Sequence, residues 1–278
     1  MDMYHDTVNC KYVRKVQLDE LARYIVRGGF PENINTNIDD IGIIPQSYLN
    51  SIITKDMHER KDKKRDSNKM RLLFRSLSRN ESTSASIDTI IKDIIEENGE
   101  SNKIENRITV NDYLSVLQDL HLFNNIDAFS TNYRSSKRVG KSSKRHFIDP
   151  SLVCASLDLS IEKLMRDLNT FGLLFESLVV RDLKIYSDYL DAHLFHFRDN
   201  ASGDEVDSII EFKDGEYGAI EIKLSGNGIE DAKSSLIKFY NNVAKKPKFM
   251  CIIVGCYDAI LKDKDMGIYI IPITALKP

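Results

Sequence analysis

Three ionisable residues near the C-terminal end of the sequence have types and spacing that suit chemistry on phosphate: Asp207, Glu221 and Lys223. Residues 205–212 and 217–223 have strand-like composition, and the side chains of a strand alternate between its two faces. Glu221 and Lys223 therefore share one face, and Ile222 points to the other. Pairing of the two strands brings Asp207 towards Glu221.

Two carboxylates at that distance repel each other unless a cation lies between them. A hard cation such as Mg²⁺ or Mn²⁺ takes oxygen ligands, a few from protein and the rest from water or phosphate. Lys223 is placed to hold or deprotonate a water. A bound metal would lower the pKa of that water and neutralise charge on a phosphate. The pattern favours a metal-dependent phosphodiesterase with Asp207 and Glu221 as metal ligands.

Glu176 is the candidate third acid of this site. It lies in a predicted helix, between Leu173 and Val180, so it borders an apolar stripe. A carboxylate in such a place usually has a partner or a functional role. We expect Glu176 to complete or support the metal site.

Each of these residues also has an ordinary structural interpretation. An acid-x-Lys triplet arises by chance in most chains of this length, and the resulting ion pair contributes about 0–1 kcal/mol. Residues Glu205–Asp207 suit an edge strand with protective charge. Glu176 suits a helix-surface position near Arg181 or Lys184. These alternatives leave a binding module without chemistry as the rival to an enzyme.

The C-terminal segment, residues 151–278, is predicted as a mixed sheet flanked by helices. Short turns join the early strands, which favours antiparallel hairpins. A crossover helix then allows the later strands to pair in parallel. The predicted helices are Thr170–Tyr189 and Ile229–Val243, and the predicted strands are His193–Arg198, Glu205–Phe212, Tyr217–Lys223, Phe249–Val254 and Gly267–Ile271.

The middle segment, residues 66–150, reads as three helices and a β-hairpin, the pattern of a winged helix. A small helical packing domain is the alternative. Thr109 and its neighbours offer capping side chains for the third helix. The predicted helices are Met70–Leu77, Ser86–Glu97 and Thr109–Leu120, and the predicted strands are Phe123–Tyr133 and Arg145–Ile148.

A basic stretch joins these two strands, and residues 128–147 contain no acidic side chain. Such a local surface can bind phosphate although the formal net charge of the chain is -3. We therefore predict DNA contact by this hairpin. Its basic residues are Arg134, Lys137, Arg138, Lys141, Lys144 and Arg145.

The first segment, residues 1–65, is predicted to be helical, with helices at Leu18–Val26 and Pro45–Arg60 separated by a turn at Gly28–Pro31. The sequence contains neither a signal-like N-terminus nor an apolar run of the ~18–20 residues that span a bilayer. It predicts a cytoplasmic protein without a membrane partner. The four cysteines form no close metal-type pairs, and Cys251 and Cys256 are expected to be buried, reduced thiols.

Several short motifs, spread over most of the chain, together resemble the family named for domain of unknown function 4143. That domain is usually the C-terminal half of bacterial and archaeal proteins with an AAA-type ATPase core in front. Asp56 is similar to an acidic position of the family. The other motifs are Gly28-Gly29-Phe30-Pro31-Glu32, Phe147-Ile148-Asp149, Gly172-Leu173-Leu174-Phe175-Glu176, Glu205-Val206-Asp207 and Ile220-Glu221-Ile222-Lys223.

The resemblance implies a restriction-endonuclease-like C-terminal domain of the PD-(D/E)xK superfamily. It makes Glu176, Asp207 and Glu221 metal ligands and Lys223 the lysine of the motif. It also implies that the Gly28–Pro31 turn belongs to the helical lid that follows the nucleotide-binding core in such ATPases. Fold membership alone does not establish nuclease activity.

One departure from the family is large, because the 278 residues contain no G-x-x-x-x-G-K-[ST] loop. We therefore expect no ATP site in this chain and interpret residues 1–65 as a lid remnant. Three alternatives for the ATPase core stay open: it is on another polypeptide, it is absent from a truncated gene product, or the remnant works without ATP. The function expected is a Mg²⁺- or Mn²⁺-dependent nuclease module. The alternative is an inactive DNA- or protein-binding assembly module that docks on a separate ATPase.

Overall fold

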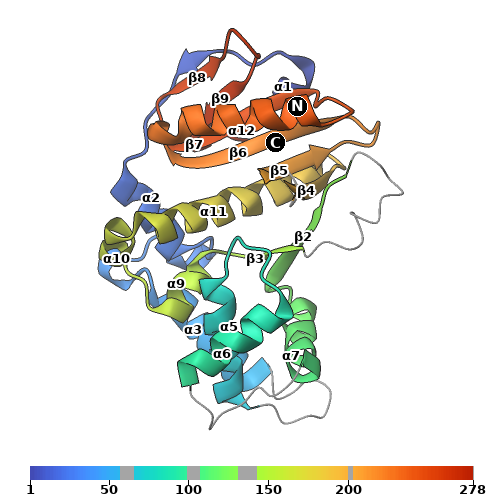
Figure 1. The fold of residues 1–278 in the computed structure, drawn as a ribbon. Coiled ribbons are helices and arrows are strands. Elements are labelled where there is room, and N and C mark those ends of the chain that lie inside the picture. Colours follow the sequence, from blue (N-terminus) through green and yellow to red (C-terminus); the bar gives the residue numbers. More distant parts are fainter. Residues whose placement is uncertain (57–65, 99–106, 131–142, 200–202, 278) are drawn as a thin grey trace. The chain divides into compact units, whose positions relative to one another are not determined.

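The computed structural model describes residues 1–56, 66–98, 107–130, 143–199 and 203–277 (Figure 1). They form two compact units that interleave along the chain. The first unit comprises Met1–Leu21, Ile126–Ser143 and Leu178–Pro278, and the second comprises Ala22–Asn125 and Lys144–Ser177. These units do not follow the predicted domain boundaries at residues 65 and 150, since each is built from separate stretches of the sequence.

The strands form a mixed sheet with the order β1-β8-β9-β7-β6-β5-β4-β2-β3, of which β3 belongs to the second unit. A mixed α+β fold is therefore confirmed. The strands are β1 (Lys11–Tyr12), β2 (Phe123–Ala128), β3 (Lys144–Phe147), β4 (His193–Asp199), β5 (Asp204–Glu211), β6 (Tyr217–Ser225), β7 (Phe249–Cys256), β8 (Ala259–Lys262) and β9 (Tyr269–Pro272).

The predicted order of the C-terminal strands is confirmed. β4, β5 and β6 pair antiparallel, as their short connections require. Helix α12 (Ile229–Asn242) then crosses over, and β7 pairs parallel to β6 and β9 parallel to β7. The long helix α11 (Leu168–Tyr189) precedes these strands, two residues longer at its start than expected.

The core of the first unit lies between α12 and one face of the sheet. Leu236 and Phe239 of α12 are fully buried against residues of β5, β6 and β7, among them Ile209, Ala219 and Ile252. Burying each such side chain contributes about 1.5–3 kcal/mol. Figure 1 shows α12 running along these strands. This packing fixes the sheet face on which the candidate site lies.

The edges of the sheet contain one strand that the sequence did not reveal, β1, and one that it predicted, β2. β1 pairs antiparallel with β8 through Lys11 opposite Ile260, so the N-terminal residues join the C-terminal unit. β2 pairs parallel with β4 through Asp127 opposite Phe195. Strands as short as β1 carry too few residues to show a periodic pattern, which explains why they were missed.

The second unit is mainly helical, and every helix predicted in it is present. The predicted Pro45–Arg60 helix is α3 followed by the π-helical turn η3, and it is described only to Asp56. Thr109 does not cap α7, because the helix already begins at Arg107. The helices are α2 (Leu18–Arg27), α3 (Ile43–Ser51), η3 (Ile52–Asp56), α5 (Ser67–Arg79), α6 (Ile87–Asn98), α7 (Arg107–Asp119), α9 (Ser151–Leu157) and α10 (Ile161–Arg166).

The order α5, α6, α7, β2, β3 matches the predicted succession of three helices and two strands. α9 packs on α3 and α5. The middle segment, residues 66–150, therefore shares its core with a helix that precedes it and a helix that follows it in the sequence. The remaining described elements are short: α1 (Asp2–His5), η1 (Pro31–Asn33), η2 (Ile38–Asp40), η5 (Gly226–Gly228) and η6 (Ile273–Ala275).

A backbone contact joins the glycine turn after α2 to the segment after β3. Gly28 ends the helix with φ +69°, a conformation that favours glycine. The Gly29 amide donates to Asp149 Oδ2 at 2.9 Å, and the Ser151 amide donates to Asp149 Oδ1 at 2.9 Å. A Cβ on Gly28 would overlap Ser151 and Asp149. Two sequence motifs over a hundred residues apart are therefore in direct contact.

The pairing of β6 with β7 depends on the absence of a side chain at Gly218. Its register partner is Phe249, and a Cβ at Gly218 would overlap the Phe249 ring. We expect Gly218→Ala to lower the free energy of unfolding by about 1–3 kcal/mol, measured by urea denaturation. Gly172→Ala in α11 is the control, because a Cβ there meets nothing within 4 Å. A Gly218→Ala protein as stable as that control would contradict this packing.

The four cysteines differ in their access to solvent. Cys10 is exposed, Cys154 and Cys251 are buried, and Cys256 is partly buried. Burial raises the pKa of the Cys154 and Cys251 thiols, which keeps them protonated and unreactive. We expect a thiol reagent at about pH 8 to label Cys10 first and to label Cys154 and Cys251 only after unfolding. Mass spectrometry of labelled peptides measures this order, and rapid native labelling of Cys251 would contradict it.

Candidate functional site

Strands β5 and β6 bring the three predicted residues together. Their register places Ser208 opposite Ile220 and Ile209 opposite Ala219. Lys223 Nζ lies 2.8 Å from Glu221 Oε2 and 3.7 Å from Asp207 Oδ2. The predicted convergence of Asp207, Glu221 and Lys223 is thus present in the structure, and one ammonium group faces both carboxylates.

Solvent exposure in this cluster increases from the carboxylates to the lysine. The side chains of Glu221, Asp207 and Lys223 are 5%, 13% and 29% exposed, respectively. Asp207 Oδ2 also accepts a hydrogen bond from the Ile222 amide at 2.8 Å. Two nearly buried carboxylates need positive charge nearby, and Lys223 supplies it while its side chain remains accessible to solvent.

The backbone before α12 shapes the lysine side of the cluster. A Cβ built on Gly228 would lie 3.1 Å from both Cγ and Cδ of Lys223. Gly228 is the residue that precedes the first turn of α12. The lysine stem therefore packs against a glycine, which leaves room for its ammonium group to reach the two acids.

The donor set of this cluster fits a magnesium-like ion. Asp207 and Glu221 offer carboxylate oxygens, and Mg²⁺ is commonly bound by one or two carboxylates with water and phosphate as further ligands. An ion there would replace the contacts that both acids make with Lys223. Among the described residues, no group of three or more His, Cys, Asp or Glu side chains is arranged for a metal. The residues present fit a two-carboxylate site that is completed by ligands from outside the chain.

Glu176 belongs to the second unit and has its own partner there. Its Oε1 lies 2.7 Å from Lys144 Nζ, and the two side chains are 13% and 5% exposed. The predicted surface partners Arg181 and Lys184 instead pair with Asp182 and Asp188. The expected approach of Glu176 to the other three site residues stays a prediction.

Lys144 does not fit its predicted role in DNA contact, because it is buried with Glu176. Arg145 is partly buried and donates to the Ala85 carbonyl at 2.5 Å, and burial lowers the pKa of its guanidinium group. Both residues lie on β3 and contact the unit's own core. The remaining basic residues of the predicted tip lie outside the described residues: Arg134, Lys137, Arg138 and Lys141.

A second buried polar group, which the sequence analysis missed, surrounds Glu81. Its carboxylate accepts hydrogen bonds from Ser177 Oγ at 2.7 Å and from the Phe147 amide at 3.2 Å. His146 Nδ1 lies 3.3 Å from Glu81 Oε1 and 3.4 Å from Ser82 Oγ. All of these side chains are under 5% exposed, so they hold elements together and are closed to substrate.

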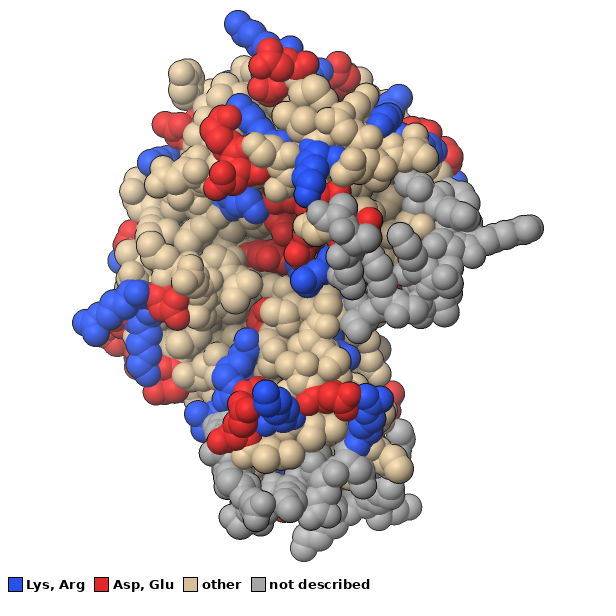
Figure 2. Space-filling model, viewed as in Figure 1, with Lys and Arg blue, Asp and Glu red and all other residues tan. Residues whose placement is uncertain are grey.

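The charged surface of the first unit mixes both signs. In the view of Figure 2, basic and acidic side chains alternate over the region of α12. This agrees with the formal net charge of -3. No helix among the described residues combines the length and apolar character needed to cross a membrane.

Comparison with protein families divides the chain into two matched regions. Residues 18–163, more than half of the chain, match the family model of the domain of unknown function DUF8612. Residues 171–276 match that of the domain of unknown function DUF4143. The chain belongs to the DUF8612 family, and its C-terminal region matches DUF4143. The predicted DUF4143 resemblance is confirmed for the C-terminal region, which includes Glu176, Asp207, Glu221 and Lys223. No curated protein matched the chain in a sequence search.

The DUF8612 match changes the interpretation of the N-terminal motifs. The Gly28–Glu32 turn and Phe147–Asp149, which we had compared with DUF4143 proteins, both lie within the DUF8612 region. They also contact each other through Gly29 and Asp149. These motifs therefore characterise the DUF8612 region of this chain.

The buried pair of Lys144 and Glu176 gives a test of the second unit. Lys144→Met would leave the Glu176 carboxylate without its cation in a buried site. We expect the free energy of unfolding to fall by about 3 kcal/mol, with most of this loss recovered by adding Glu176→Gln. Lys92→Ala, at an exposed pair with Glu96, is the control and should cost under about 0.5 kcal/mol. Equal denaturation midpoints for the Lys144 and Lys92 variants would contradict a stabilising ion pair between Lys144 and Glu176.

Proposed function

We propose that this protein is a metal-dependent phosphodiesterase that acts on nucleic acid, with DNA as the expected substrate. The observation that supports this most is that Asp207 and Glu221, on neighbouring strands, share the ammonium group of Lys223. The two acids and the lysine lie on one face of the sheet, and solvent reaches the group at Lys223. Such a group can bind a cation and act on a water. The DUF4143 match covers all three residues.

In this proposal Asp207 and Glu221 would hold Mg²⁺ or Mn²⁺, which would supply a bound water of lowered pKa and neutralise charge on the phosphate. Lys223 would then be free of its contacts with both carboxylates. The ammonium group, held at the end of a stem packed on Gly228, then orients the attacking water. The Ile222 amide keeps Asp207 in position by its hydrogen bond. The basic stretch around residues 134–141 is the expected contact to the nucleic acid backbone.

An assembly module without catalysis is the second candidate. The observation that favours it is the engagement of Glu176 by Lys144 in a buried ion pair. Because Glu176, the third acid, is already paired with Lys144, the group of Asp207, Glu221 and Lys223 would serve as a structural ion-pair cluster. The protein would then bind DNA or a separate ATPase.

Metal binding by the wild-type protein is the first test of the proposed function. We expect millimolar Mg²⁺ or Mn²⁺ to raise the melting temperature, since a ligand at 100 times its dissociation constant stabilises by about 2.7 kcal/mol. Asp207→Asn should abolish this response, because Asn is nearly isosteric and uncharged. Glu230→Gln, an exposed acid-to-amide change on α12, should keep it. Calorimetry that detects no metal binding to the wild type would favour the assembly module.

Cleavage of plasmid and single-stranded DNA is the second test. We expect Lys223→Ala to keep metal binding and to lose cleavage, because Lys223 acts on the water and not on the ion. The loss should be at least about 100-fold in rate, the usual contribution of a positioned proton-transfer group. Lys233→Ala on α12 is the matched control and should cleave as the wild type does. Metal binding without any cleavage by the wild type would also point to assembly.

A further inference from the structure

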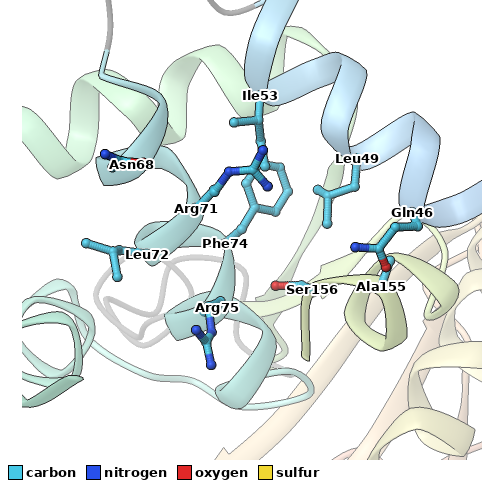
Figure 3. Close-up of a pocket in the computed structure, with 10 residues that line it drawn as sticks. All are labelled: Gln46, Leu49, Ile53, Asn68, Arg71, Leu72, Phe74, Arg75, Ala155 and Ser156. Carbon is cyan, nitrogen blue, oxygen red and sulfur yellow. The ribbon is translucent and has the colours of Figure 1, made fainter. Parts of the chain in front are cut away.

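A groove of about 580 Å³ lies in the second unit and is lined by residues of α2, η2, α3, α9 and α10. Helices α3 and α9 pack against each other at this groove. Figure 3 shows Gln46 of α3 and Ala155 of α9, two of its lining residues, close together where the helices meet. All of the lining residues lie within the DUF8612 match, so the groove is a feature of that region.

Apolar side chains of this groove are open to solvent. Ile38 and Ile43 are 45% and 56% exposed. The buried side chains of Val26 and Ile41 and the partly buried side chain of Ile161 line the same groove. Exposed apolar side chains that gather in one place commonly mark a site where another protein docks. An apolar face of a partner would remove Ile38 and Ile43 from water.

The charged residues of the groove favour a cationic partner. Its two basic side chains are already engaged, because Lys163 Nζ lies 2.9 Å from Asp158 Oδ2 and Arg23 interacts elsewhere in the protein. Among the residues that the structure describes, the Asp39 carboxylate has no partner and Glu162 forms no ion pair. One of these two acids lies on η2 and the other on α10, and both can attract an incoming cation.

We propose that this groove is a docking site for an amphipathic helix of a partner protein, with an apolar face bordered by lysine or arginine. Ile38 and Ile43 contact the apolar face, and Asp39 and Glu162 attract the basic side chains. Asp40, which follows Asp39 in η2, adds another exposed acid. The proposal does not depend on the proposed nuclease activity, because none of these residues belongs to the Asp207 cluster.

Two synthetic helical peptides labelled with fluorescein test this assignment on the full-length protein. One has leucine on one face and lysine on the other, and the second has glutamate in place of each lysine. We expect fluorescence anisotropy to show one saturable site for the lysine peptide, with a dissociation constant at least about tenfold below that of the glutamate peptide. Equal affinity for the two peptides, or no saturable binding of the lysine peptide, would overturn the proposal.

Two double variants separate the groove from other exposed apolar surface. Ile38→Ser/Ile43→Ser should raise the dissociation constant of the lysine peptide about tenfold or more, because it removes the apolar contact. Ile108→Ser/Ile185→Ser changes two isoleucines outside the groove that are 79% and 58% exposed, and it should leave this constant unchanged. Equal weakening in both variants would show non-specific apolar binding and would count against the groove. Circular dichroism checks that each variant is folded.

The acidic side of the groove is tested with a second pair of variants. Asp39→Asn/Asp40→Asn should weaken binding of the lysine peptide about threefold or more, whereas Asp258→Asn/Asp265→Asn, at two exposed acids of the first unit, should not. An equal effect of the two pairs would indicate attraction by net charge alone and would contradict the proposal.

Sedimentation of the protein without peptide tests a second copy of the chain as the occupant. We expect Ile38→Ser/Ile43→Ser to leave the sedimentation coefficient unchanged. A wild-type dimer that this variant dissociates would assign the groove to self-association and overturn the assignment to a partner.

Discussion

Two carboxylates on neighbouring strands must be compensated by positive charge, and much of the first unit is arranged around that requirement. Asp207 and Glu221 are nearly buried on the face of the sheet that α12 covers further along. Lys223 follows Glu221 by two residues, so the alternation of the strand places its ammonium group beside both acids. Gly228 leaves space for the lysine stem. Replacing Lys223 by an uncharged residue would remove the cation that both carboxylates share.

The second unit also compensates its buried carboxylates, through contacts that solvent reaches less easily. Lys144 pairs with Glu176, and Glu81 accepts hydrogen bonds from Ser177 and from the Phe147 amide. These contacts tie α11 to β3 and to the residues after α5. Their side chains are at most 13% exposed, whereas Lys223 is 29% exposed. This difference in access is why we place the proposed chemistry at Lys223 and give the Glu81 group a structural role.

The two family regions and the two compact units divide the chain differently. The DUF8612 match ends at residue 163 and the DUF4143 match begins at residue 171, close to the start of α11. The boundary between the units falls within α11, after Ser177, and residues 1–21 belong with the C-terminal strands. The DUF4143 region thus supplies Glu176 to one unit and Asp207 to the other. A single helix therefore carries a buried ion pair of one unit and leads directly into the sheet of the other.

The sequence by itself determined the local elements and the local part of the site. Alternating strand patterns and short turns predicted β4, β5 and β6, and the helix after Lys223 predicted the parallel pairing of β7, because these features depend on neighbouring residues. The position of Glu221 and Lys223 on one face followed from strand geometry alone. Only the tertiary structure decided that Lys144 pairs with Glu176, that Glu81 binds Ser177 and that β1 joins β8. Each of these contacts joins residues far apart in the chain, and a single sequence holds no periodic signal for such a contact.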